Sequence, residues 1–146
     1  MVADVVCAIR GGPGSYQTRL GALRYAVDHG VAVHFLSVVD PVAYEPLHAG
    51  EQHAIRAEMA WRDVALARAT AAHAELDDVR FTVGVRVGEL AKTIGEYANE
   101  LEAASILIGR PRSAPDAILV DVGADHFAAE LRQKSGLPVR VMTSGS

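Results

Sequence analysis

Two segments of the chain are continuously apolar, and a third alternates between apolar and polar positions. Residues 5–9 and 104–108 carry almost only apolar side chains, a pattern typical of strands buried on both faces of a parallel sheet. Residues 31–39 form another β-rich run, which ends at Asp40. Residues 79–87 instead alternate, with valines and a phenylalanine on one face and arginine, threonine and glycine on the other. One face of that strand therefore meets solvent, which predicts a place at the sheet edge.

Segments with helical spacing lie between these strands. Leu20, Leu23 and Val27 repeat at helical intervals until Gly30 supplies a stop. After a loop from about Tyr44 to Gly50, residues 51–76 predict a long alanine-rich helix. Further helices are expected at residues 90–101 and, after a loop over 110–123, at about 125–134, followed by a last strand at 138–143. No composition break suggests a linker, so we predict one α/β domain over residues 1–146, with a mostly parallel, Rossmann-like sheet and helices on both faces.

Composition narrows the class of function. The chain has 146 residues, of which half are apolar, and its 14 basic and 18 acidic side chains give a net charge of −4. This charge disfavours nucleic acid as a partner. The sequence has no apolar stretch near the ~20 residues that span a bilayer, so no membrane insertion is expected. A single cysteine, Cys7, excludes a disulfide framework and favours the cytoplasm.

In a fold of this class, ligands bind beyond the carboxyl ends of the strands, where the strand order reverses. Those segments are residues 10–15 and 109–124, both rich in turn residues and arginine. The first matches neither the dinucleotide fingerprint nor the P-loop, because no third glycine and no Gly-Lys-Ser/Thr follow. The six histidines show no metal-ligand spacing, so no metal site is predicted. Trp61, Tyr16 and Tyr97 lie in helical patterns and are interpreted as packing residues.

Several of these segments, in order and spacing, resemble the universal stress protein family over nearly the whole chain. The first strand leads into Gly-Gly-x-Gly-Ser at residues 11–15, and the second ends in Val38-Val39-Asp40. After a long second helix, Val85-x-x-Gly88 precedes the third. The run 104–109 then leads to Gly136-x-Pro138-Val139-x-Val141. The resemblance implies a five-stranded sheet of order 3-2-1-4-5, similar to that of adenine nucleotide alpha hydrolases, and agrees with the edge position predicted above.

Nucleotide-binding members of that family hold ATP with an acidic residue after the first strand and a glycine pattern after the fourth. That pattern is Gly, two residues, Gly, nine residues, then Gly with Ser or Thr. By this resemblance the candidate binding positions are Arg10, Gly11, Val39, Asp40, Gly109, Arg110, Arg112, Gly123 and Ala124. The chain departs from the pattern, because Arg10 replaces the acidic residue, Arg112 replaces the second glycine, and Gly123-Ala124 falls one residue late.

These departures weaken a phosphate site. A glycine-rich loop binds phosphate through free backbone N–H groups, and Pro111 and Pro115 each remove one. No cofactor is therefore expected. As an alternative, Arg10, Arg110 and Arg112 could converge and bind ATP, AMP or another small anion through their guanidinium groups. A third interpretation leaves these arginines solvated, or paired with aspartates such as Asp40.

The sequence thus predicts a universal stress protein-like regulatory or binding module, with no catalytic residue and with ATP binding lost or weakened. The main alternative is an adenine nucleotide or small-anion binding protein. A remote alternative is an adenylating enzyme of the ATP-pyrophosphatase type, whose Ser-Gly-Gly-x-Asp-Ser loop faintly resembles residues 10–15, with Gly14 in place of the Asp. The resemblance also implies a homodimer through the last strand, at Val139 and Val141, which covers an otherwise bare sheet edge.

Overall fold

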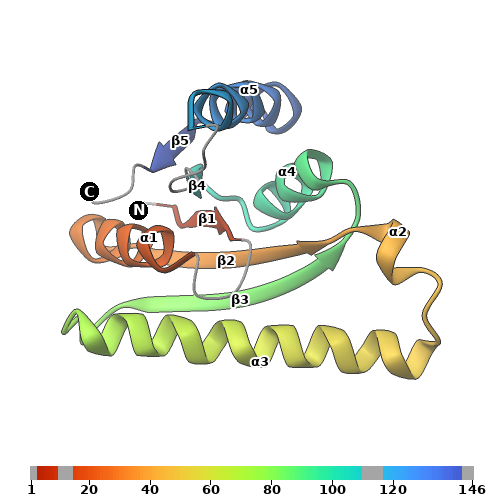
Figure 1. Cartoon of the computed structure of the whole chain (residues 1–146). Coiled ribbons are helices and arrows are strands. Elements are labelled where there is room, and N and C mark those ends of the chain that lie inside the picture. Colours follow the sequence, from red (N-terminus) through yellow and green to blue (C-terminus); the bar gives the residue numbers. More distant parts are fainter. Residues whose placement is uncertain (1–2, 10–14, 110–116, 143–146) are drawn as a thin grey trace.

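The computed structural model describes residues 3–9, 15–109 and 117–142, the side chains of 117–124 excepted. Its five-stranded sheet has the order β3-β2-β1-β4-β5, and each neighbouring pair is parallel. The strands are β1 (Val5–Ala8), β2 (Ala32–Val39), β3 (Arg80–Val87), β4 (Ser105–Gly109) and β5 (Val139–Met142). The predicted fold class and sheet order are confirmed, and the alternating strand β3 lies at an edge as expected (Figure 1).

Within the described residues, five helices lie around this sheet: α1 (Tyr16–His29), α2 (Pro41–Tyr44), α3 (Ala49–His73), α4 (Leu90–Glu100) and α5 (Ala117–Ser135). On one face, Cys7, Phe35 and Leu107 pack in a core that includes Leu23 of α1 and Ala67 of α3. On the other face, a second core joins Val6, Leu36 and Ile106 to Ile94 of α4 and Leu131 of α5. The continuous apolar runs of β1 and β4 follow from this arrangement, because both strands are covered on both faces.

Two helices differ from the sequence prediction. The short helix α2 was not expected; Asp40 begins it, and its side chain accepts a hydrogen bond from the backbone N–H of Val42 at 2.9 Å. Helix α5 begins at Ala117, well before the predicted start near residue 125. The prediction took Gly123 as a loop residue, but an interior glycine costs a helix only about 1 kcal/mol and does not by itself end it.

Candidate functional site

The carboxyl ends of β1, β2 and β4 lie side by side. Ala8 is in register with Leu36 on one side and with Ile108 on the other. The backbone N–H of Ile9 donates to the carbonyl of Leu36 at 2.9 Å, which extends the pairing of β1 and β2 by one residue. The loops after β1 and β4 therefore begin next to each other. The predicted binding residues of those loops, Arg10, Gly11, Arg110 and Arg112, lie outside the described residues.

Two of the predicted binding residues, Val39 and Asp40, lie at the end of β2. Val39 is its last residue, and its carbonyl accepts the N–H of Gly88 at 3.1 Å. Asp40 is exposed, and its carboxylate caps α2. The structure thus places Val39 and Asp40 at the carboxyl ends of the strands, here called the mouth of the sheet. Each already accepts a hydrogen bond from a backbone N–H of the chain.

Gly109 ends β4 in close contact with α1. A Cβ at Gly109 would collide with Oγ1 of Thr18, so a larger residue there requires the threonine side chain to move. This contact fixes the first turns of α1 against β4, beside the loops that follow β1 and β4. The sequence prediction named Gly109 but missed Thr18, because a threonine inside a helical pattern carries no distinctive signal.

A buried polar cluster lies on the α1 and α3 face of the sheet, next to these strand ends. Arg19, Ser37, Asp63 and Thr70 are each at most 2% exposed. The Nε of Arg19 donates to Oγ1 of Thr70 at 3.5 Å. Ser37 donates its hydroxyl to Oδ2 of Asp63 at 2.7 Å. The cluster therefore links α1, β2 and α3 by polar contacts within an otherwise apolar core.

The electrostatics of this cluster follow from its burial. Burial lowers the pKa of Arg19, and the nearby Asp63 carboxylate opposes that shift by stabilising the cation. Among the described residues, Oδ1 of Asp63 is the one buried side-chain polar atom without a hydrogen-bond partner. Burial also raises the pKa of the Cys7 thiol to about 12, so this thiol stays protonated and unreactive at neutral pH.

Gly123 and Ala124, the remaining predicted binding residues, do not lie in a loop. Both fall within α5, beyond its first turn. In an α-helix the backbone N–H groups beyond the first turn donate to carbonyls four residues earlier. The amides of Gly123 and Ala124 are therefore used by the helix, and the prediction of a loop that extends to about Gly123 is wrong.

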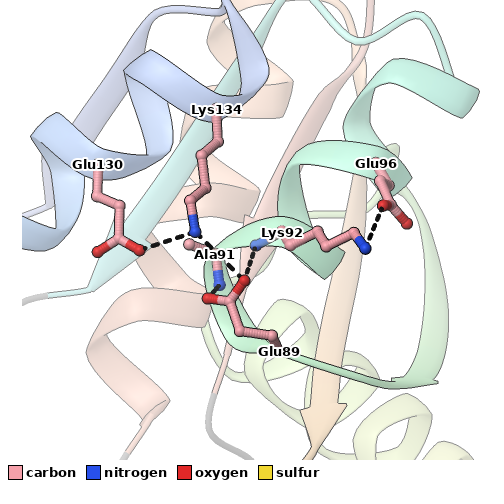
Figure 2. A network of polar contacts seen from close by, with 6 residues as sticks. All are labelled: Glu89, Ala91, Lys92, Glu96, Glu130 and Lys134. Carbon is pink, nitrogen blue, oxygen red and sulfur yellow. Dashed lines mark hydrogen bonds and ion pairs between the residues drawn. The ribbon is translucent and has the colours of Figure 1, made fainter.

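A surface groove of about 530 Å³ lies away from the strand ends, where the C-terminal end of α5 meets α4. It is lined by Lys92, Gly95, Glu96, Asn99, Glu100 and Lys134. Figure 2 shows the ion pairs around it: Lys134 bridges Glu89 at 3.3 Å and Glu130 at 3.2 Å. Because both lysines are paired with glutamates, the groove offers no unpaired positive charge for an anionic ligand, and we assign it no function.

The described residues hold neither a metal-binding group nor a membrane-spanning helix. They contain no group of three or more His, Cys, Asp or Glu side chains that could hold a metal ion. Within the same residues, no helix is long and apolar enough to cross a membrane.

Sequence reasoning missed the buried polar cluster, although a signal was present. Asp63 precedes Ala67, Thr70 and Ala71 at the spacing of one helix face, and these are the buried residues of α3. The assignment of all three aromatic residues to packing is wrong for Trp61, which is 77% exposed, and right for Tyr97, which is 7% exposed.

Comparison with known proteins agrees with this geometry. A model described as the universal stress protein family matches residues 1–125. A universal stress protein from Archaeoglobus fulgidus, solved in complex with dAMP, has a TM-score of 0.63 at 17% identity, covering 97% of each chain. A universal stress protein solved in complex with cAMP has a TM-score of 0.64 at 18% identity, covering 98% of each chain. UspA from Lactobacillus plantarum has a TM-score of 0.61 at 16% identity, covering 97% of each. No curated protein sequence matches the chain.

Proposed function

The chain belongs to the universal stress protein family, and on that premise we propose that it is a regulatory or binding module without catalytic activity, in which ATP binding is lost or weakened. The observation that carries the proposal is the position of Gly123 and Ala124 within α5. A phosphate cradle needs backbone N–H groups that are free to donate, and a helix beyond its first turn leaves none free.

The sequence supports the same conclusion from the two loops. Pro111 and Pro115 lack the N–H donor, and arginine at position 112 resists the positive φ that glycine adopts. Arg10 stands where nucleotide-binding relatives are expected to hold an acidic residue. The end of β2 supports the same conclusion, because the Asp40 carboxylate already caps α2.

Isothermal titration calorimetry with ATP and AMP tests the proposal. We expect no saturable binding in the micromolar range for the wild-type chain. Micromolar binding of ATP that disappears in Arg10→Ala or Arg112→Ala would overturn the proposal. Arg24→Ala is the matched control, because Arg24 is an exposed arginine of α1 outside the candidate site.

A second candidate function is the binding of an adenine nucleotide or another small anion by the arginines of the two loops. It is favoured by the register of β1 with β4, which starts the loops carrying Arg10 and Arg110 next to each other. Guanidinium groups bind phosphate and carboxylate in a forked geometry. Titration with AMP and with inorganic pyrophosphate separates the two ligands. Binding of both, with loss in Arg10→Ala, favours an anion site without base recognition.

The proposal includes a homodimer formed through β5 in the cytoplasm. It is supported by the position of β5 at the sheet edge and by Val141, which is half-buried there. Unpaired edges are rarely left bare in soluble proteins. Light scattering at micromolar concentration should give the mass of a dimer, and a monomer mass would contradict this part of the proposal.

A further inference from the structure

Helix α3 has an exposed face that the described structure leaves uncovered. Trp61 lies in the middle of α3 and is 77% exposed. Residues 49–62, the first half of the helix, contain no buried residue, and burial begins at Asp63. In Figure 1, α3 forms the outermost layer beside β3, and no other element is drawn beyond it. Exposed tryptophan is uncommon on a monomer's surface and is enriched at the centres of interfaces.

Small residues flank this tryptophan along one stripe of the helix. Ala54, Ala57, Ala65 and Ala72 recur with Trp61 at helical spacing, Arg68 lies on the same stripe between Ala65 and Ala72, and all six are exposed. Ala57 and Ala65, one turn before and one turn after Trp61, leave room for a second helix to approach closely on both sides of the indole ring. The stripe is therefore shaped like half of a helix–helix contact, with one large side chain at its centre.

The position of Trp61 identifies the partner. Residue 61 is the midpoint of α3 (Ala49–His73), so a second α3 laid antiparallel about this point places Trp61 beside its own copy. The same alignment places Ala57 of one copy opposite Ala65 of the other. We propose that this face of α3 binds α3 of a second copy of the chain, in a symmetric antiparallel pair centred on Trp61.

The charges that flank the stripe complement one another in this pairing. Glu58 and Arg62 are both exposed and lie on the same side of the stripe. The described structure gives neither of them an ion pair within the chain. With a rise of about 1.5 Å per residue, Glu58 of one copy lies roughly level with Arg62 of the other. Because the pairing is symmetric, this contact occurs twice. A parallel pair would place the sides carrying Glu58 and Arg62 on opposite sides of the contact and would lack it.

The interface is separate from the β5 edge. Helix α3 lies next to β3, at the opposite edge of the sheet from β5. A chain that uses both contacts would form assemblies larger than a dimer. A single helix pair is a small interface, so we expect it to form reversibly at micromolar or higher concentrations.

Because Trp61 is the only tryptophan in the sequence, its fluorescence reports on this contact alone. We expect its emission maximum to shift to shorter wavelength as the protein concentration rises. The β5 dimer leaves Trp61 exposed and cannot produce that shift. Glu58→Arg and Arg62→Glu should each abolish the shift, because each copy then meets like charges. An equimolar mixture of the two variants should restore it, because the unlike copies are complementary.

Restoration on mixing cannot arise from a change within one chain, so it distinguishes the symmetric pair from an effect on helix stability. Ala65→Glu should also weaken the association by at least about tenfold, whereas Ala129→Glu, on an exposed position of α5, should leave it unchanged. An emission maximum that does not depend on concentration overturns the proposal. A shift that persists in both charge variants, or that appears only on adding vesicles or another protein, also overturns it.

Discussion

The helices on one face of the sheet, α1 and α3, bury charged side chains, whereas the charged side chains described in α4 and α5 lie at the surface. Arg19 and Asp63 are each 1% exposed between α1, α3 and β2. On the opposite face the core is apolar, and the ion pairs of Lys134 with Glu89 and Glu130 lie at its exposed rim (Figure 2). Polar contacts between buried side chains thus contribute to packing on one face of the sheet, whereas apolar contacts form the core on the other.

This difference indicates that α1 and α3, next to the candidate site, are held in one arrangement more strictly than α4 and α5. Ser37 binds Asp63 and lies two residues before Val39, at the mouth of the sheet. A buried charge is costly unless its partner is correctly placed, so the cluster allows α1 and α3 few alternative positions next to the candidate site. Surface ion pairs contribute little and leave α4 and α5 positioned by apolar contacts.

Removal of a buried charge is the strongest way to test this contrast. Arg19→Met keeps most of the side-chain volume but leaves the carboxylate of Asp63 buried without its nearby cation. We expect the free energy of unfolding in urea to fall by about 3–5 kcal/mol. The double variant Arg19→Met/Asp63→Leu should recover much of this loss because it removes both charges. A loss below about 1 kcal/mol in the single variant would mean that the cluster does not constrain the fold.

Alanine substitutions at two closely packed glycines, Gly109 and Gly95, should give a smaller difference in stability than removal of a buried charge. Gly109→Ala places a methyl group against Thr18, and should destabilise the fold by about 1–3 kcal/mol. Gly95→Ala, on α4, meets its nearest atom in Ser135 at 3.4 Å, and alanine also favours the helix. Its thermal midpoint should stay close to that of the wild type. Equal midpoints for both variants would contradict the tight packing at the mouth.

The smallest expected effect concerns pH at the rim of α4 and α5. Burial raises the pKa of Glu89, but hydrogen bonds from Lys134 and from the N–H of Lys92 outweigh it, so the net pKa is lowered. A lowered carboxyl pKa means that Glu89 stabilises the fold at neutral pH and loses this effect as the pH falls through its folded pKa. The difference in stability between the wild type and Glu89→Gln should therefore shrink on acidification.

Lys134, the partner of Glu89, should show the opposite dependence of stability on pH. Hydrogen bonds to Glu130 and Glu89 raise the pKa of Lys134, so its contribution is present at neutral pH and is lost as the pH rises through that raised pKa. Urea denaturation of the wild type, Glu89→Gln and Lys134→Met across the pH range measures the free energy of unfolding and checks both predictions. A difference that does not vary with pH would show that the rim pairs have no influence on stability.

The sheet could be predicted from the sequence because its signal is repeated along each strand. The continuous apolar runs of β1 and β4 and the alternation of β3 determine which strands are central and which lies at an edge. The candidate site could be predicted only in part. Val39, Asp40 and Gly109 lie at strand ends as expected, but Gly123 was assigned to a loop because a single glycine does not distinguish a turn from a helix interior.

The buried charges and the exposed tryptophan were missed for a related reason. From residue type alone, Arg19 is expected to face solvent and Trp61 to be buried in the core. In the structure, Arg19 is buried and Trp61 is exposed. Helical periodicity gives the faces of a helix, but it does not say which face meets the sheet when alanines are spread over all of them, as in α3. Only the packing of α3 against β2, β3 and α1 decides that question.

The proposed loss of ATP binding depends on the amides of Gly123 and Ala124, which lie within α5. Two-dimensional NMR of the ¹⁵N-labelled chain tests it directly through the signals of Gly123 and Gly109. We expect the Gly123 amide to exchange slowly with solvent, as in a helix, and neither signal to move when ATP is added to millimolar concentration. Saturable shifts of both signals at micromolar ATP, with rapid exchange at Gly123, would contradict it.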